Sequence, residues 1–449
     1  MSAGLGRVTV AVLSWNGRAH LASCLEALAA QQPPGVDWEV SILDNGSDDG
    51  TAEWLEREYG AGRRLGANGD GRLRWRTSGR NTGFCEGNNR LVEDSDADAV
   101  VLLNNDTRPE PGWLGELVEA LGGAPPDVAA MSGTMVDWEA RRLDFARGAM
   151  TFDGHAFQLD HRRALERVEL PADGSELLFA CGGNMIVRRD RYRAAGGFDP
   201  RYFAYLEDVD LGWRLWAGGE RVTLARRAVV RHRSMASSQA LGTFNRGILF
   251  ERNAFVTAAT NYDDDLWPRL MPAVLLTLVA RVQWLLTRSN PGGETLAEDP
   301  YAATGSGAAS PPPQPTWLQK WRGWGTRELA RRGVRKLRRR LAVALHPELA
   351  SGDAAALAAV DLRDPRTIAH LRAVSKILVD LDGVAARRAR LADRRRRPDR
   401  EIFERFPLLL VPTYPGDEEL FASRGFRAWL PTDLPIVERT LEQIMELDG

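Results

Sequence analysis

The sequence predicts an α/β fold, with a mostly parallel sheet in the first half and a mainly helical region after it. Apolar runs at 8–13, 40–43 and 100–103 have the length of buried strands. The segment 20–31 between two of them spaces its leucines as a helix does. Strands that alternate with helices are typical of a parallel sheet. After about residue 239 the pattern becomes helical.

The chain of 449 residues is long for one compact core, so we expect more than one domain. Composition divides it into four segments. They are a strand–helix domain at 1–238, a helical extension at 239–288, a flexible linker rich in Pro, Gly and Ser at 289–316, and a basic helical C-terminal region at 317–449.

Charge and cysteine content exclude several classes of protein. The net charge of −2 gives no general reason to expect nucleic-acid binding. Three scattered cysteines are too few for a disulfide framework or a zinc site, and they suit a reducing compartment. Residues 1–7 lack a signal-peptide pattern, and Arg281 interrupts the longest apolar run, 270–286. We therefore expect a cytoplasmic protein without a spanning helix.

Carboxylates directly follow two of the predicted strands. Asp44 ends the second apolar run, and Asp106 follows the run 100–103 behind Asn104 and Asn105. Ligands of open α/β sheets bind beyond the carboxyl ends of the strands, so we expect both in one crevice. Asp106 is suited to Mg²⁺ or Mn²⁺, and Asp44 to the N–H of a uracil or thymine base. Simple turn formation is the alternative for both.

Two further segments carry candidate groups. Glu207 and Asp208 open a predicted helix, where acids are commonly only favourable partners of the helix dipole. The functional interpretation is that Asp208 takes a proton from an acceptor hydroxyl, with Tyr205 in a sugar-facing wall. His232 follows a strand-like run, and its cationic surroundings suit either a diphosphate or a solvated strand end.

Several motifs occur in a fixed order and together resemble the family 2 glycosyltransferases with the GT-A fold, in their rhamnosyltransferase-like and galactofuranosyltransferase-like branch. The motifs are VAVLSWNG at 10–17, DNGSDDGT at 44–51, NTGF at 81–84, LNND at 103–106, GGNM at 182–185, GFD at 197–199, EDVDLGWR at 207–214 and His232. The resemblance covers about half of the chain and implies that 1–238 is a nucleotide-sugar-binding catalytic domain.

The resemblance implies roles at the matching positions. Asp44 binds the base, Asp106 matches the last residue of an Asp-X-Asp metal motif, Asp208 is the catalytic base and His232 is a second metal ligand. Asn104 stands where the motif has its first aspartate, in a form that resembles the rhamnosyltransferase-like branch. The remaining donor-binding candidates are Asn16, Asn81, Gly83, Asn88, Asn104 and Asn105. The acceptor or sugar candidates are Gly182, Gly183, Asn184, Tyr205 and Glu207.

The implied reaction is a single inverting displacement that uses Mg²⁺ or Mn²⁺. The resemblance favours dTDP-rhamnose as donor, with UDP-galactofuranose and UDP-glucose as alternatives, and a cell-envelope glycan or glycolipid as acceptor. A non-catalytic sugar-binding scaffold is a further alternative. A nucleotidyltransferase is disfavoured, because the first strand leads into Ser14-Trp15-Asn16-Gly17 and not into a glycine-rich loop with a basic residue.

The late part of the chain concentrates positive charge. Three tryptophans precede a dense arginine run within 317–345, which is typical of a helix at an anionic membrane surface. A helical pair packed on the catalytic domain, with a solvated basic face, is the alternative. We thus expect peripheral contact with the cytoplasmic face of a membrane. A second basic run, 387–400, is either disordered or a phosphate-binding segment.

Overall fold

The computed structural model describes residues 4–32, 34–60, 64–65, 69, 71–233, 242–288 and 365–447. The predicted linker 289–316 and the tryptophan- and arginine-rich stretch 317–345 lie outside the described residues. The chain divides into two compact units, and the larger one comprises 1–281, 299–305 and 369–449. All sites described below belong to this larger unit.

A ten-stranded mixed sheet forms its centre, in the order β3-β4-β2-β1-β5-β11-β7-β12-β6, with β8 paired to β7. The predicted parallel half is confirmed. It contains β1 (Arg7–Ser14), β2 (Asp37–Asp44), β4 (Gly71–Thr77) and β5 (Ala99–Asn104), all mutually parallel where they pair. The side chains of β1, β2 and β5 are almost continuously buried, as expected for strands covered on both faces, whereas β4 is partly exposed.

The other half of the sheet brings distant segments together. It contains β6 (Thr107–Pro109), β7 (Val128–Asp137), β8 (Leu143–Phe145), β11 (Asn184–Arg188) and β12 (Arg221–His232), and β3 (Arg64–Leu65) lies at the far edge. Strand β12 runs parallel to β7 but antiparallel to β6, with His232 opposite Thr107. This register places His232 beside Asp106.

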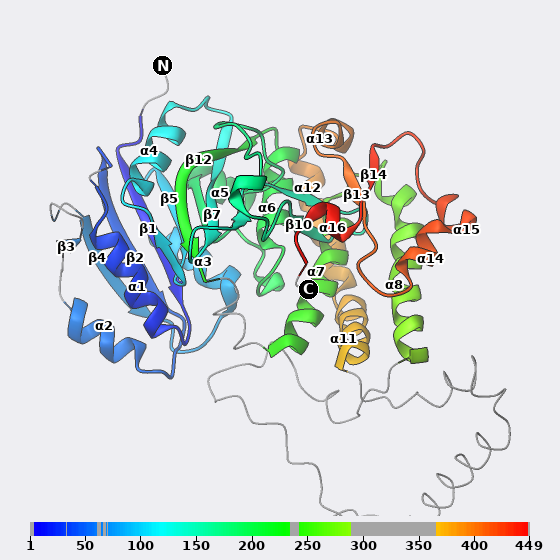
Figure 1. Ribbon diagram of the computed structural model, residues 1–449, viewed down its shortest axis with the longest axis horizontal. Coiled ribbons are helices and arrows are strands. Elements are labelled where there is room, and N and C mark those ends of the chain that lie inside the picture. Colours follow the sequence, from blue (N-terminus) through cyan, green and yellow to red (C-terminus); the bar gives the residue numbers. More distant parts are fainter. Residues whose placement is uncertain are drawn as a thin grey trace, which may run out of the picture. The chain divides into compact units, whose positions relative to one another are not determined.

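Helices lie along the sheet, and two more lie beside the C-terminal helices (Figure 1). Those along the sheet are α1 (Arg18–Ala29), α2 (Thr51–Tyr59), α3 (Gly83–Glu93), α4 (Trp113–Gly123), α5 (Arg189–Ala195) and α6 (Glu207–Ala217). The other two are α7 (Gly242–Asn261) and α8 (Trp267–Arg288). After β7 the chain forms the hairpin β9 (Gly148–Met150) and β10 (Ala156–Gln158). No described helix is both long and apolar enough to cross a membrane.

The described C-terminal part is mainly helical, as predicted. It contains α11 (Pro365–Val379), α12 (Leu381–Arg394), α13 (Asp399–Arg405), β13 (Leu408–Leu410), α14 (Asp417–Ala422), α15 (Arg424–Arg427), β14 (Ile436–Glu438) and α16 (Leu441–Ile444). Its side chains join the main core: Phe403 packs 5.3 Å from the Trp213 ring of α6, and the Trp213 indole N–H donates to Asp399. The basic run 387–400 is therefore ordered.

Candidate active site

Asp44 is the last residue of β2 and lies opposite Ser14 of β1. It is buried, and its Oδ1 accepts a bond from the Ser47 N–H at 3.3 Å. Asn16, at the end of β1, accepts from the Asp48 N–H at 2.9 Å, and its own N–H donates to Ser47 Oγ at 2.9 Å. The residues after β1 and β2 thus form one connected edge around the Asp44 carboxylate.

Asn45 fastens the neighbouring loop to this edge. Its amide donates to Asn81 Oδ1 and to the Gly83 carbonyl, both at 3.1 Å, and its Oδ1 accepts from the Thr82 N–H at 3.1 Å. Gly46 has a φ of 76°, and a Cβ there would lie 2.5 Å from the backbone of Arg80. The glycine is required because the two loops touch through their backbones.

Asn81 and Asn88 hold this loop and the start of α3. Asn81 Oδ1 also accepts the Gly83 N–H at 2.8 Å, and the Asn88 amide donates to the Phe84 carbonyl at 3.0 Å. Both side chains are buried. They were expected to contact the donor, whereas in the structure their side chains form hydrogen bonds within the loop itself.

The Asn-Asn-Asp segment follows β5 as predicted. The Asn104 N–H donates to the Gly183 carbonyl at 3.1 Å, and the Asn105 amide donates to Ser14 Oγ at 2.9 Å. Asp106 is only 4% exposed, and its Oδ1 has no hydrogen-bond partner among the described residues. Oδ1 lies 3.3 Å from His232 Nε2. A buried carboxylate oxygen is therefore left facing the imidazole.

His232 is oriented by a second carboxylate. Its Nδ1 lies 2.5 Å from Asp144 Oδ2 on β8, and His161 Nδ1 approaches the other oxygen of Asp144 at 3.3 Å. Burial opposes the imidazolium charge, but the neighbouring carboxylates of Asp106 and Asp144 outweigh it and raise the pKa of His232 to about 10. Burial raises the pKa of Asp106, whereas His232 lowers it, and the net direction is downward. A cavity of about 550 Å³ opens beside His232 and Asp144.

Asp208 and Asp106 are connected through two glycines. Asp208 Oδ2 accepts the Gly182 N–H at 3.1 Å, and the Gly183 carbonyl accepts the Asn104 N–H. A Cβ at Gly183 would lie 2.7 Å from the Asn104 amide nitrogen, so no larger residue fits this approach without movement. The start of α6 and the end of β5 thus both contact the Gly182-Gly183 backbone.

Burial raises the pKa of Asp208, while the Gly182 N–H opposes the shift. Burial and then the charge of Asp208 raise the pKa of the adjacent Glu207. Glu207 Oε2 has no hydrogen-bond partner among the described residues. A carboxylate with a raised pKa is a stronger proton acceptor, which suits a general base.

The backbone before α6 is strained. Phe203, Tyr205 and Leu206 have φ values of 63°, 71° and 64°. Asn253 of α7, fully buried, donates to the carbonyls of Tyr202, Ala204 and Tyr205 at 3.1, 2.8 and 2.9 Å. Strain of this kind persists only where surrounding contacts hold it, and it concentrates at functional sites.

Asn184 does not lie where it was expected. It is 0% exposed, its Oδ1 accepts the Trp113 indole N–H at 2.8 Å, and its amide faces the carbonyls of Thr134 and Ala228. A side chain that is enclosed and bonded at both ends has no surface left for a sugar. Asn184 is a framework residue behind Gly183.

Sequence reasoning missed Asp144, His161 and Asn253. Asp144 contacts His232 across 88 residues of sequence, and Asn253 contacts Tyr205 across 48. Neither lies in a recognisable motif. No sequence signal singles out either residue, since Asn253 directly follows two other polar residues, Glu251 and Arg252.

The residues present fit a divalent cation. Asp106 offers an unpartnered oxygen, and Asp144 holds Nδ1 of His232 so that Nε2 faces Asp106, an arrangement common for metal-ligating histidines. Among the described residues, no group of three or more His, Cys, Asp or Glu side chains is placed to hold a metal by itself. Ligands from a bound diphosphate would have to complete such a site.

Comparison with known proteins agrees with this geometry. The profile described as "Glycosyl transferase family 2" matches residues 9–195. The N-acetylglucosaminyl-diphospho-decaprenol L-rhamnosyltransferase of Mycobacterium tuberculosis is 27% identical over 253 residues, or 51% of this chain and 76% of that protein. Glycosyltransferase AglE of Haloferax volcanii is 25% identical over 232 residues, or 52% and 68%.

Among solved structures, the mannosyltransferase PcManGT of Pyrobaculum calidifontis with GDP-Man and Mn²⁺ has a TM-score of 0.42 and 16% identity, over 84% of this chain and 88% of that one. That degree of likeness carries no functional conclusion. The profile match covers the strands that end at Asp44 and Asn104, and Asp208 and His232 lie beyond it on the same compact unit. The chain thus carries a family 2 glycosyltransferase domain, matched over residues 9–195 and built on a mostly parallel sheet.

Proposed function

We propose that the protein is an inverting, metal-dependent transferase that moves a sugar from a nucleoside diphosphate to an acceptor hydroxyl. The observation that carries the proposal is the backbone link from Asp208 through Gly182 and Gly183 to Asn104, two residues before Asp106. It brings a carboxylate suited to proton abstraction to the same place as a carboxylate suited to a cation. An in-line displacement needs both.

Asp208 acts as the base. Its raised pKa favours proton uptake, and the Gly182 N–H fixes the orientation of one oxygen. It removes the proton of the acceptor hydroxyl as that oxygen attacks the anomeric carbon from the side opposite the leaving diphosphate. The configuration at that carbon is therefore inverted, and no covalent enzyme intermediate forms.

Asp106 and His232 would hold Mg²⁺ or Mn²⁺, whose charge stabilises the departing diphosphate. Ligands must be deprotonated, so Nε2 of His232 has to give up its proton on binding. Asp144 keeps the ring oriented during this exchange through Nδ1. The Asp44 carboxylate accepts a hydrogen bond from the nucleotide base of the donor. Asn104 and Asn105 hold Asp106 in position at the end of β5.

The donor we favour is dTDP-rhamnose. The support is the name of the Mycobacterium tuberculosis relative, a rhamnosyltransferase, and the order of motifs in this chain. Asp44 can accept from the N3–H of thymine or uracil alike, so UDP-galactofuranose and UDP-glucose are the alternative donors.

The acceptor we favour is a lipid-linked glycan of the cell envelope. The support is again that relative, whose name specifies a diphospho-decaprenol acceptor. A lipid-linked acceptor would also explain tryptophans beside arginines at 317–345, a stretch outside the described residues. Peripheral contact with an anionic membrane is thus part of the proposal.

Calorimetric titration with dTDP-rhamnose, UDP-glucose, UDP-galactose and GDP-mannose, with and without Mn²⁺, tests the donor site. We expect Mn²⁺-dependent binding of one thymidine or uridine sugar, lost in Asp106→Ala. Glu119→Ala, which removes an exposed carboxylate on α4, is the matched control and should bind as the wild type does. A folded wild-type protein that binds none of these donors would contradict the assignment.

A further inference from the structure

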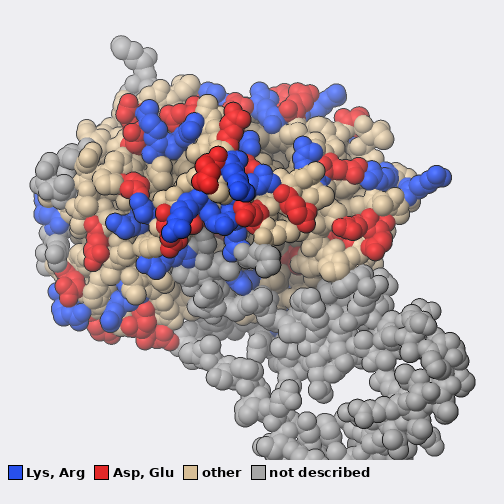
Figure 2. Space-filling model, in the orientation of Figure 1, with Lys and Arg blue, Asp and Glu red and all other residues tan. Residues whose placement is uncertain are grey.

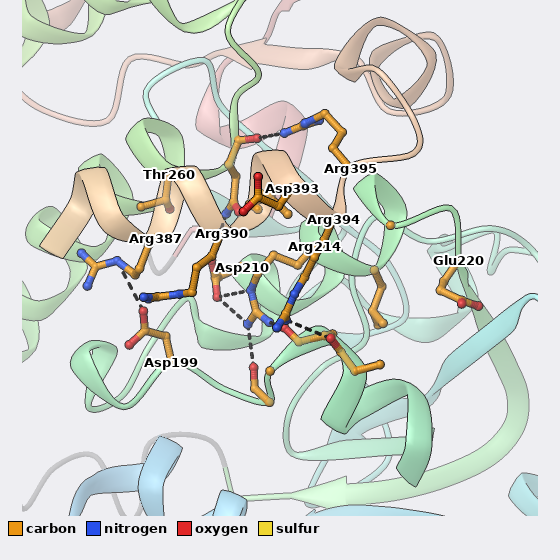
Figure 3. A pocket seen from close by; sticks show the side chains of 18 of the residues that line it. Asp199, Asp210, Arg214, Glu220, Thr260, Arg387, Arg390, Asp393, Arg394 and Arg395 are labelled. Carbon is orange, nitrogen blue, oxygen red and sulfur yellow. Dashed lines mark hydrogen bonds and ion pairs between the residues drawn. The ribbon is translucent and has the colours of Figure 1, made fainter.

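A second polar cavity lies between α12 and the pair α5–α6, with a volume of about 770 Å³ (Figure 3). Asp210 lines it, whereas Asp208 faces Gly182. Two residues apart on a helix, these side chains point to opposite sides of α6. The cavity is therefore separate from the reaction centre.

Arginine dominates the lining, with eight arginines against four carboxylates. Some of this charge is neutralised locally. Arg191 pairs with Glu220 at 2.7 Å, and Arg214 pairs with Asp210 at 2.6 Å. Arg395 turns away from the other arginines, toward Asp399 and the Asn261 carbonyl (Figure 3).

Three arginines of the lining, Arg390, Arg394 and Arg396, have no ion pair among the described residues. Arg390 and Arg396 form no ion pair or hydrogen bond through their side chains with any described residue, and Arg394 donates to the Ala194 carbonyl at 2.9 Å. Of the four carboxylates that line the cavity, Asp393 is the exposed one. Figure 2 shows Lys and Arg side chains gathered across the middle of this face of the molecule.

A buried guanidinium adds an independent observation. Arg387 is 8% exposed and lines the cavity, with its Nη2 bonded to Asp380 at 2.9 Å. Its Nη1 and Nε have no hydrogen-bond partner among the described residues, although Nε lies 3.4 Å from Asp199 Oδ2. Buried donors without an acceptor are unfavourable, and an oxygen of a ligand in the cavity would satisfy them.

We propose that this cavity binds a ligand through phosphate groups, most naturally a diphosphate. Guanidinium groups match phosphate oxygens in a forked geometry, and several of them around one cavity suit two linked phosphates. The ligand is either a soluble diphosphate or the diphosphate headgroup of a lipid. The site is additional to the donor site and does not depend on Asp44, Asp106 or Asp208.

Calorimetry on the full chain tests the proposal with inorganic diphosphate as the probe, in metal-free buffer so that the proposed donor site stays inactive. A second arm measures co-sedimentation with phosphatidylcholine vesicles with and without a polyprenyl diphosphate. The cavity variant is Arg390→Gln/Arg396→Gln. The matched control is Arg400→Gln/Arg424→Gln, which removes the same charge from exposed positions outside the cavity.

We expect the cavity variant to lose affinity at least about tenfold, the equivalent of one charge-assisted hydrogen bond, while the control binds as the wild type does. This result with inorganic diphosphate identifies a soluble ligand. The same result only with polyprenyl diphosphate vesicles identifies a lipid headgroup. A wild-type protein that binds neither probe would overturn the proposal. So would an equal loss of affinity in both variants, or an unchanged affinity in the cavity variant. Donor titration with Mn²⁺ on the same variants verifies their fold independently.

Discussion

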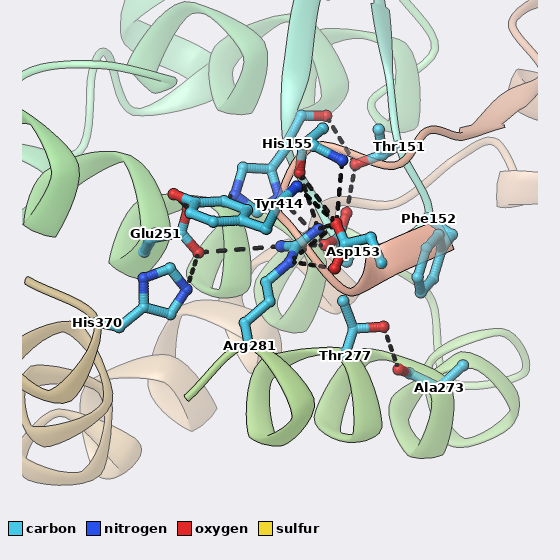
Figure 4. A network of polar contacts seen from close by, with 12 residues as sticks. Thr151, Phe152, Asp153, His155, Glu251, Ala273, Thr277, Arg281, His370 and Tyr414 are labelled. Carbon is cyan, nitrogen blue, oxygen red and sulfur yellow. Dashed lines mark hydrogen bonds and ion pairs between the residues drawn. The ribbon is translucent and has the colours of Figure 1, made fainter. Parts of the chain in front are cut away.

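His155→Gln removes a buried cation from a network that joins the β9–β10 hairpin and helices α7 and α8 to the C-terminal part (Figure 4). His155 lies between Asp153 and Glu251, with its ring nitrogens 3.2 Å from a carboxylate oxygen on each side. Arg281 of α8 bonds to Asp153 at 3.0 Å and to Asp417 at 2.8 Å. All five side chains are buried.

The size of the expected loss of stability follows from the pKa of His155. Burial opposes its charge, but Asp153 and Glu251 more than compensate and raise the pKa from 6.5 to about 9. This shift in pKa between the unfolded and the folded protein contributes about 3 kcal/mol to the free energy of folding. Because the folded-state pKa is raised, this contribution is complete below pH 6.5 and is lost as the pH rises through 9.

Guanidinium-induced unfolding at pH 6 and pH 9.5, followed by tryptophan fluorescence, measures the effect. The free-energy difference between wild type and His155→Gln should shrink by about 3 kcal/mol between the two pH values. His232, whose pKa is also raised, titrates in both proteins and cancels in the difference. An equal difference at both pH values would show that His155 is not held as a buried imidazolium.

Two further substitutions test the backbone around the site. Gly83→Ala places a Cβ 2.6 Å from the Phe203 ring at a φ of 85°, so we expect a loss of about 2–4 kcal/mol in unfolding free energy with an unchanged denaturant slope. A loss below 0.5 kcal/mol would be too small for this geometry. Asn253→Ala releases the strained carbonyls before α6, and turnover should fall about ten- to hundredfold while donor affinity stays unchanged. Unaltered turnover in steady-state assays would refute a positioning role for Asn253.

Local sequence signals were sufficient for the parallel half of the sheet. The apolar run before Asn104 forms β5, and Asp44 ends β2, because uninterrupted apolar strands have to be buried on both faces. Because the carboxyl ends of parallel strands meet at one edge of a sheet, the polar residues that follow these strands were predicted to lie at that edge. Gly83 was predicted as a donor-binding candidate, and its contact with Phe203 could not be read from the sequence.

Partners contributed from distant segments could not be read from the sequence. Asp144 meets His232 because β8 and β12 both pair with β7, and this strand order depends on the whole sheet. Asn184 shows the opposite error: its motif suggested a sugar contact, but packing against Trp113 encloses it. The charge pattern of the basic run 387–400 fits both a disordered and a phosphate-binding segment, because it does not reveal that Arg387 is buried against Asp380.

Single-turnover transfer by Asp208→Asn tests the central claim most directly, that Asp208 and Asp106 perform different tasks at one site. The amide keeps the size of the side chain but cannot accept the hydroxyl proton. The account predicts donor binding with Mn²⁺ like that of the wild type and transfer slowed by at least about 10²-fold, the usual contribution of a general base. Transfer at the wild-type rate, or loss of donor binding in the folded variant, would contradict it.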